Sequence, residues 1–159
     1  MIKSKVKTSD SNPQQIKNFQ KKIKGKEKAY VTIGVHPDAG TYGDGTSVVE
    51  VALWNEYGTS TIPERSFIRS AIDQNTKLIE AWRLEMIENI LTKDWSVKQA
   101  LEAIGFRVQT LIQNKIKSNV PPPNAPSTLA QKRRDGTGSN TLINTGLLLR
   151  SIGYKVYGA

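Results

Sequence analysis

The longest run of regularly spaced apolar residues begins at Ser66 and continues to about Leu91. Because apolar side chains recur every three or four positions, the run predicts one amphipathic helix of about 25 residues. A second long run starts after Ser96, which forms the capping-box pattern with Gln99, and ends near Ile116. The pattern therefore predicts two long helices.

Alternation of apolar and polar side chains marks two strands. In residues 29–35 every second residue is a branched apolar one, which is typical of a strand with one buried face. The same alternation returns around Tyr154, close to the end of the sequence. Before it, Asn144 or Thr145 is placed to cap a brief helix.

Two shorter helices are expected over residues 13–24 and 47–58. Asn12 precedes the first and is a typical N-cap residue, followed by a proline in the first turn. The second segment also admits a strand because of its valines, but Ser47 and Glu50 have the spacing of a capping box. We favour a short helix there.

Residues 36–46 and 118–140 are predicted to be long loops. The first is rich in glycine, and the second contains four prolines and ends in glycine and polar residues. We expect both to be mobile in the isolated protein and to gain order in an assembly. The fold class that follows is α+β, a small, mostly antiparallel sheet packed by two long helices, with extended loops.

The charge of +9 divides the chain of 159 residues into two parts. Residues 1–28 hold nine lysines against two carboxylates, a charge of +7, whereas residues 29–159 carry only +2. We interpret residues 1–28 as a basic arm with a short helix and residues 29–159 as a single domain. The hydrophobic fraction of 37% predicts a lean core.

The basic arm is interpreted either as a solvated, mobile segment or as a contact to DNA or to an acidic protein surface. The arm has no arginine, and its one aromatic residue is Phe19, so any DNA contact would be non-specific. The candidate contact residues are Lys17, Lys21, Lys22 and Lys24.

Metal and cofactor chemistry finds little support. The chain has no cysteine and one histidine, His36, which excludes a zinc site with nitrogen or sulfur ligands. Asp38, Asp44 and Glu50 leave an oxygen-ligand site formally open, but their spacing lacks the rhythm of a calcium loop. We assign these residues to turn chemistry and expect no metal and no cofactor.

Enzymatic motifs are also missing. A nuclease of the two-carboxylate and lysine type would need a lysine where Ala52 stands. The glycines of residues 40–45 match neither a Walker A loop nor a dinucleotide fingerprint, and no serine has the setting of a nucleophile elbow. A carboxylate pair for glycoside cleavage stays open, although nothing singles one out. We expect no catalytic residues.

The stretch from Leu53 to Ile72 is better interpreted as a structural corner ahead of the long helix. Glu56 is placed to pair with Arg65 or Arg69 across the corner. Two aromatic residues, Tyr57 and Phe67, are expected to pack beneath the corner. Gly58 and Pro63 are expected to end the preceding helix.

The same stretch resembles the signature of the tail-completion, or head–tail joining (neck), proteins of tailed bacteriophages. The matching residues are Ala52, Asn55-Glu56-Tyr57-Gly58-Thr59, Ile62-Pro63, Arg65, Phe67-Ile68-Arg69 and Ala71. Ser66 stands where the family often has another proline. The resemblance continues in a proline-rich segment, Pro121–Pro126 with Ser127-Thr128-Leu129 and Lys132, and in a C-terminal motif, Leu142-Ile143, Thr145-Gly146, Leu148, Ser151-Ile152 and Tyr154.

The resemblance implies a virion structural protein that forms a ring in the neck. Its partners would be other copies of itself, the head connector or adaptor, and the tail terminator or tail tube, with possible non-specific contact to packaged DNA. The protein would be found in the virion, and in the host cytoplasm before assembly. The alternative is a non-specific DNA-binding protein acting through the lysine-rich arm. No apolar run approaches the roughly 18 residues of a membrane span, so no membrane contact is expected.

Overall fold

Two antiparallel strands, β1 (Tyr30–Val35) and β2 (Ile152–Tyr157), bring segments from the two halves of the chain together. The computed structural model describes residues 12–159, and in that part of the chain these strands form one two-stranded sheet. Tyr30 pairs with Tyr157 at one end of the ladder, and Val35 pairs with Ile152 at the other. The expected α+β class with a small antiparallel sheet is confirmed.

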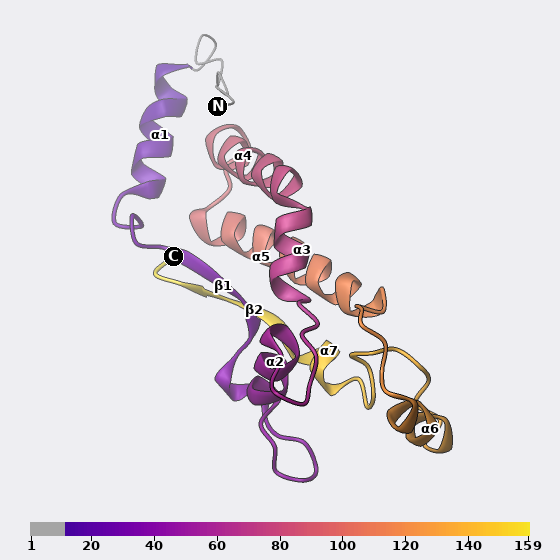
Figure 1. Ribbon diagram of the computed structural model, residues 1–159. Coiled ribbons are helices and arrows are strands. Elements are labelled where there is room, and N and C mark those ends of the chain that lie inside the picture. Colours follow the sequence, from indigo (N-terminus) through magenta and orange to yellow (C-terminus); the bar gives the residue numbers. More distant parts are fainter. Residues whose placement is uncertain (1–11) are drawn as a thin grey trace.

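Helices account for most of the remaining described residues (Figure 1). The long helix α5 lies against the sheet, and α4 packs on α5. At one end of the molecule α1 lies beside α4, and at the other end α2 and α7 lie at the end of the sheet, with α6 farther out beyond α7. The helices are α1 (Pro13–Ile23), α2 (Val48–Tyr57), α3 (Ile68–Gln74), α4 (Thr76–Thr92), α5 (Val97–Lys117), α6 (Pro126–Arg134) and α7 (Leu147–Ser151).

The predicted capping signals for α1, α2 and α5 are confirmed. The side chain of Asn12 caps α1, and Ser47 and Ser96 form capping boxes with Glu50 and Gln99 at the starts of α2 and α5. Each box satisfies N–H groups of the first turn that have no partner within the helix. The choice of helix over strand for residues 47–58 is therefore confirmed.

The single helix predicted from Ser66 to Leu91 is wrong, because the chain breaks it at Asn75. There the backbone leaves the helical region, with φ −120° and ψ 17°, and separates α3 from α4. The Asn75 side-chain amide donates to the carbonyl oxygen of Ala71 at 2.8 Å. This local bond offers the backbone an alternative to continuing the helix, as asparagine often does.

The prediction of one loop over residues 118–140 is also wrong, since α6 occupies its middle. Pro126 stands at the first position of α6, where its missing N–H has no partner to lose. The caps proposed for the last helix are wrong too, because Gly146, with φ 77°, occupies the N-cap of α7. The hydroxyl oxygen of Thr145, the residue before this N-cap, accepts a hydrogen bond from the Leu147 N–H at 3.3 Å. The predicted loop 36–46 contains a short 3-10 turn at Pro37–Ala39.

The core has two parts. The larger joins α2, α3, α5, α7 and the sheet, and its fully buried side chains are Val48, Phe67, Ile112, Ile116 and Ile152. The smaller lies between α4 and the start of α5, where Met86, Ile90 and Ala100 are buried. Phe19 packs against this second cluster, so α1 of the basic arm docks on the domain. Among the helices of residues 12–159, none combines the length and apolar character that crossing a membrane requires.

Candidate functional site

The carboxylate of Glu56 is the centre of the corner between α2 and α3. Glu56 is only 3% exposed, and it accepts backbone N–H groups from Phe67 and Ile68 at 2.8 Å and from Arg69 at 2.9 Å. The Ser66 hydroxyl donates to it at 2.8 Å. These are the N–H groups that the first turn of α3 leaves unpaired, so Glu56 on α2 caps α3 from outside it.

The environment of Glu56 favours its charged form. Burial alone would raise the pKa of Glu56, but the N–H groups of Ile68 and Arg69, the Ser66 hydroxyl and the Phe67 N–H together hold it below its usual value. A carboxylate surrounded by donors in this way is stable as an anion. The corner is therefore built around a fixed negative charge.

The sequence predicted that Glu56 pairs with either Arg65 or Arg69, and in the structure it pairs with Arg69. Its Nε lies 3.2 Å from the Glu56 carboxylate, and its terminal nitrogen lies 2.6 Å from Glu64. The guanidinium carbon also stands 4.8 Å from the centre of the Tyr57 ring. Arg69 thus closes the outside of the corner, where its side chain remains half exposed.

Arg65 does not pair with Glu56, so that alternative is not realised. Its side chain is buried and donates to the carbonyl oxygens of Pro122 at 2.8 Å and Pro123 at 3.2 Å. Burial lowers the pKa of Arg65. Arg65 therefore fastens the corner to the proline-rich segment, a long-range contact that spacing along the chain does not reveal.

The two aromatic residues of the corner behave differently. Phe67 is fully buried in the core, as predicted, whereas Tyr57 is 60% exposed and the prediction that it packs beneath the corner is wrong. Tyr57 lies on the outer side of α2, opposite the buried Val48, Ala52 and Glu56. Gly58 ends α2 with φ 76°, and an added Cβ would stand 2.9 Å from the Glu64 nitrogen.

Pro63 is exposed in the turn that follows α2. The turn is closed by the Thr59 N–H, which donates to the Ile62 carbonyl oxygen at 2.8 Å, and by the Ile62 N–H, which donates to the Thr59 hydroxyl at 2.9 Å. This turn leads directly into the Glu56-centred corner. The predicted corner residues, apart from Tyr57, therefore all take part in turning the chain from α2 into α3.

Residues of the C-terminal motif lie next to this corner. Leu148 is buried in the same core as Phe67, and the Ser151 hydroxyl donates to the Leu147 carbonyl oxygen at 2.8 Å. Tyr154 on β2 packs directly on Gly105 of α5, where an added Cβ would come within 2.7 Å of the ring. The motif shapes α7 and β2 and their contact with the rest of the core.

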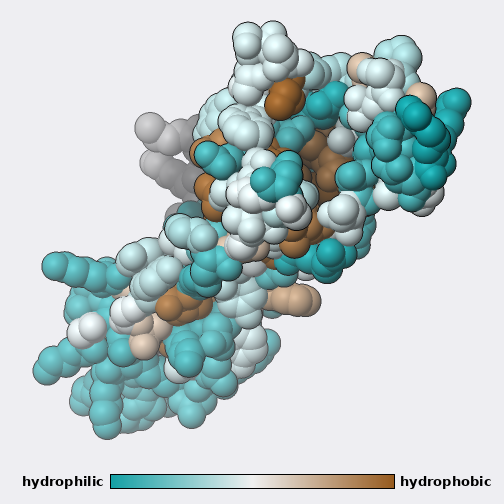
Figure 2. All heavy atoms as spheres, turned by 90° about the horizontal axis from the view of Figure 1, so that it is seen from below, coloured by the Kyte–Doolittle hydropathy of each residue, from teal (hydrophilic) through white to brown (hydrophobic). Residues whose placement is uncertain are grey.

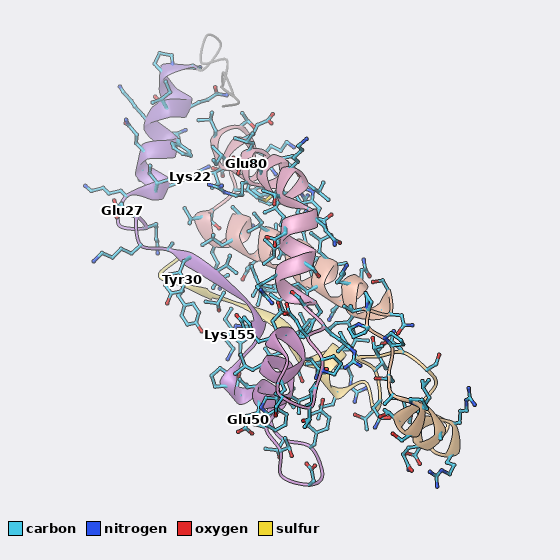
Figure 3. All side chains as sticks on the ribbon, in the orientation of Figure 1. Lys22, Glu27, Tyr30, Glu50, Glu80 and Lys155 are labelled. Atoms are coloured by element: carbon cyan, nitrogen blue, oxygen red, sulfur yellow. The ribbon has the colours of Figure 1, made fainter. Side chains whose placement is uncertain are left out.

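The lysines of the basic arm separate into two kinds. Lys17 and Lys21 are exposed on α1, and Lys24 is exposed at its C-cap. Lys22 instead donates to the Ile90 carbonyl oxygen at 3.0 Å and pairs with Asp94 at 2.6 Å, which ties α1 to the end of α4 (Figure 3). Lys22 therefore has a structural contact, while the other three face solvent.

The carboxylates weighed as metal ligands have local partners. Asp38 pairs with Lys155 at 2.7 Å, Asp44 accepts from the Thr46 N–H at 2.9 Å, and Glu50 accepts from the Ser47 N–H at 3.2 Å. The Lys155 bond holds the pKa of Asp38 below its usual value. Within residues 12–159, no three side chains of the metal-binding types come together as a possible ligand set.

A cavity of about 410 Å³ opens where the corner, the proline-rich segment and the C-terminal motif meet. We call it the α2–α6 hollow; α2, α6 and α7 contribute walls together with the loops at residues 42–46 and 124. Figure 2 looks onto this end of the molecule and shows apolar residues between more polar surroundings. The residues used below are Asp44, Val51, Trp54, Asn55, Asn124, Gln131, Lys132, Asp135, Leu142, Asn144, Leu147 and Leu148.

The sequence did not indicate the position of Lys132. Lys132 is only 6% exposed, although it lies in a polar stretch beside two exposed arginines. Its ammonium group donates to the carbonyl oxygens of Asn140 at 2.5 Å and Ile143 at 2.6 Å. A lysine among charged neighbours normally lies in solvent, so no local signal distinguishes it.

Comparisons of the chain with protein-family models, with curated proteins and with solved structures find no match.

Proposed function

We propose that the protein is a structural component of a tailed-phage virion, a subunit of a ring in the neck that joins the DNA-filled head to the tail. The observation that carries the proposal is the convergence of the segments resembling neck proteins. Glu56 and Arg65 link the first motif to α3 and to the proline-rich segment, and Leu148 of the last motif shares their core. The segments that resemble neck proteins therefore meet in one region of the fold.

The outer face of α2 supports a role in assembly. Leu53, Trp54 and Tyr57 are neighbours on this helix, and they are 50%, 39% and 60% exposed. Contiguous large apolar side chains on a surface helix are typical of a protein interface. The Glu56 cap fixes the orientation of this face, as a ring with repeated identical contacts requires.

The proposed location can be tested on purified virions. Antibody against the protein, visualised with gold particles, is expected to label the junction between head and tail. The proposed partners there are further copies of the chain, the connector or adaptor, and the tail terminator or tube. Labelling spread over the head shell, or absence of the protein from virions, would contradict the proposal.

A second candidate function is non-specific DNA binding by α1. The exposed side chains of Lys17, Lys21 and Lys24 favour it, because they are free to meet phosphates. Three phosphate contacts predict that the logarithm of affinity falls with the logarithm of salt concentration with a slope of about −3. Salt-sensitive DNA binding by a monomer favours this candidate, whereas oligomers insensitive to salt favour the neck ring.

A further inference from the structure

Lys132 brings a buried positive charge to the wall of the α2–α6 hollow. Its ammonium group has three N–H donors, and two of them are used by the carbonyl oxygens of Asn140 and Ile143. Among the described residues no further acceptor is bonded to this nitrogen. One donor of a buried charged group is therefore left for a ligand.

Arg65 is a second buried cation, but its side chain does not line the hollow. Burial, and then the positive charge of Arg65, lowers the pKa of Lys132. Arg65 bonds to carbonyl oxygens of the proline-rich segment, and in residues 12–159 neither cation forms a salt bridge with a carboxylate. Buried charges in proteins are normally paired, so the Lys132 ammonium on the wall of the hollow, which has no carboxylate partner among the described residues, points to a missing anion.

The residues that line the hollow indicate what kind of molecule carries the anion. Apolar side chains and side-chain amides, which can bond a peptide backbone, both line the hollow. The apolar residues are Val51, Trp54, Leu142, Leu147 and Leu148, and the amides are Asn55, Asn124, Gln131 and Asn144. A volume of about 410 Å³ accommodates a short segment with one large side chain.

We propose that the α2–α6 hollow binds a peptide segment of a partner protein, with an aliphatic side chain against the apolar wall and a carboxylate on the Lys132 ammonium. That the partner is a neighbouring neck protein rests on the proposed function. The binding chemistry does not, because it follows from the Lys132 ammonium and the other residues that line the hollow.

The carboxylates that line the hollow favour a ligand with a single negative charge. Asp44 and Asp135 line the hollow with exposed side chains, held by the Thr46 N–H and by the Gln131 amide. They repel a doubly charged phosphate more strongly than a carboxylate. A carboxylate also suits the single remaining Lys132 donor, while the rest of the segment is expected to be neutral or basic.

The test uses N-acetyl-leucine, which carries an amide, an aliphatic side chain and a carboxylate, and N-acetyl-leucinamide, which lacks the charge. Each is titrated into the full-length protein and followed by two-dimensional NMR. N-acetyl-leucine is expected to bind at least about tenfold more tightly, since a hydrogen bond to a charged group is worth that much. Contacts from its methyl groups should reach Val51 and Leu148.

Two variants test the role of the charge. Lys132→Met should remove the preference for the carboxylate, and Arg133→Met, which alters an exposed cation on the same helix, should keep it. If Lys132→Met does not fold, the methyl contacts and the preference measured on the unmodified protein decide alone. Equal binding of the two compounds, binding elsewhere, or no binding of either at 50-fold excess would overturn the proposal. Failure here leaves the gold-labelling result at the neck unaffected.

Discussion

Glu56 takes the place of a local cap by reaching α3 from the neighbouring helix. Replacing Glu56 by Gln keeps the shape but puts an amide NH₂ where an oxygen now accepts N–H groups or a hydroxyl. Because buried donors would then lose their acceptor, we expect Glu56→Gln to lower the free energy of unfolding by about 3 kcal/mol or more. Urea denaturation measures this. A change below about 1 kcal/mol would contradict the cap.

The same carboxylate predicts a pH dependence. The pKa of Glu56 is lowered in the folded protein from its ordinary value of 4.5. Its contribution to stability is therefore complete above that value and is lost as the pH falls through the folded pKa. Between pH 6 and pH 3, the unmodified protein should lose more stability than Glu56→Gln does. Parallel curves for the two proteins would show that Glu56 has no linked proton.

Phe67 and Tyr57 offer a matched pair of aromatic residues in one corner. Phe67 is fully buried, so Phe67→Ala should lower the free energy of unfolding by about 3–5 kcal/mol. Tyr57→Ala removes an exposed ring and should change it by less than about 1 kcal/mol. Thermal and urea unfolding of both variants check this, and similar losses for the two would contradict the assigned burial.

Residue spacing predicted part of the corner and missed the rest. Local spacing placed Glu56 within reach of Arg65 or Arg69 across one turn, and the pair with Arg69 is the one that forms. The burial of Arg65 and Lys132 did not, because each depends on carbonyl groups of loop segments that only the folded chain brings near. Tyr57 was misassigned because an aromatic residue on a short helix fits either face equally well.

At the scale of elements, α5 packs tightly against the sheet at Gly105. A Cβ there would lie 2.7 Å from the Tyr154 ring, so Gly105→Ala should lose about 1–3 kcal/mol of stability despite the better helix propensity of alanine. In a protein that already carries Tyr154→Ala, which removes the ring, Gly105→Ala should cost less than in the unmodified protein. Gly43→Ala, in open space, is the control and should be nearly neutral. Thermal unfolding measures all of these variants, and a stabilised Gly105→Ala would contradict the packing.

Element boundaries were predicted best where a side chain satisfies the first turn of a helix. The capping boxes at Ser47 and Ser96 are of this kind. The break at Asn75 was missed because the apolar spacing continues across it, and α6 was missed because Pro126 was taken as a loop signal. An asparagine can stand inside a helix or break it, and a proline can stand in a loop or at the first position of a helix. The packing around each residue decides which structure forms.

At the scale of the whole molecule, the proposed ring predicts that Arg69 affects assembly more than folding. Its side chain is half exposed, so Arg69→Ala should lower stability only slightly. If the corner faces a neighbour in the ring, incorporation of Arg69→Ala into virions should still fall sharply. The thermal midpoint and the amount of protein in purified particles are measured together. If the thermal midpoint and the incorporation into particles are both unchanged, Arg69 forms local ion pairs and has no role in assembly.

The most direct measurement is electron microscopy of particles made by a phage that lacks this protein. The proposed neck role predicts DNA-filled heads and separate tails, or heads that lose their DNA, with replication unaffected. Supplying the protein from a plasmid should restore joined particles. Normal joined virions in its absence would contradict the account.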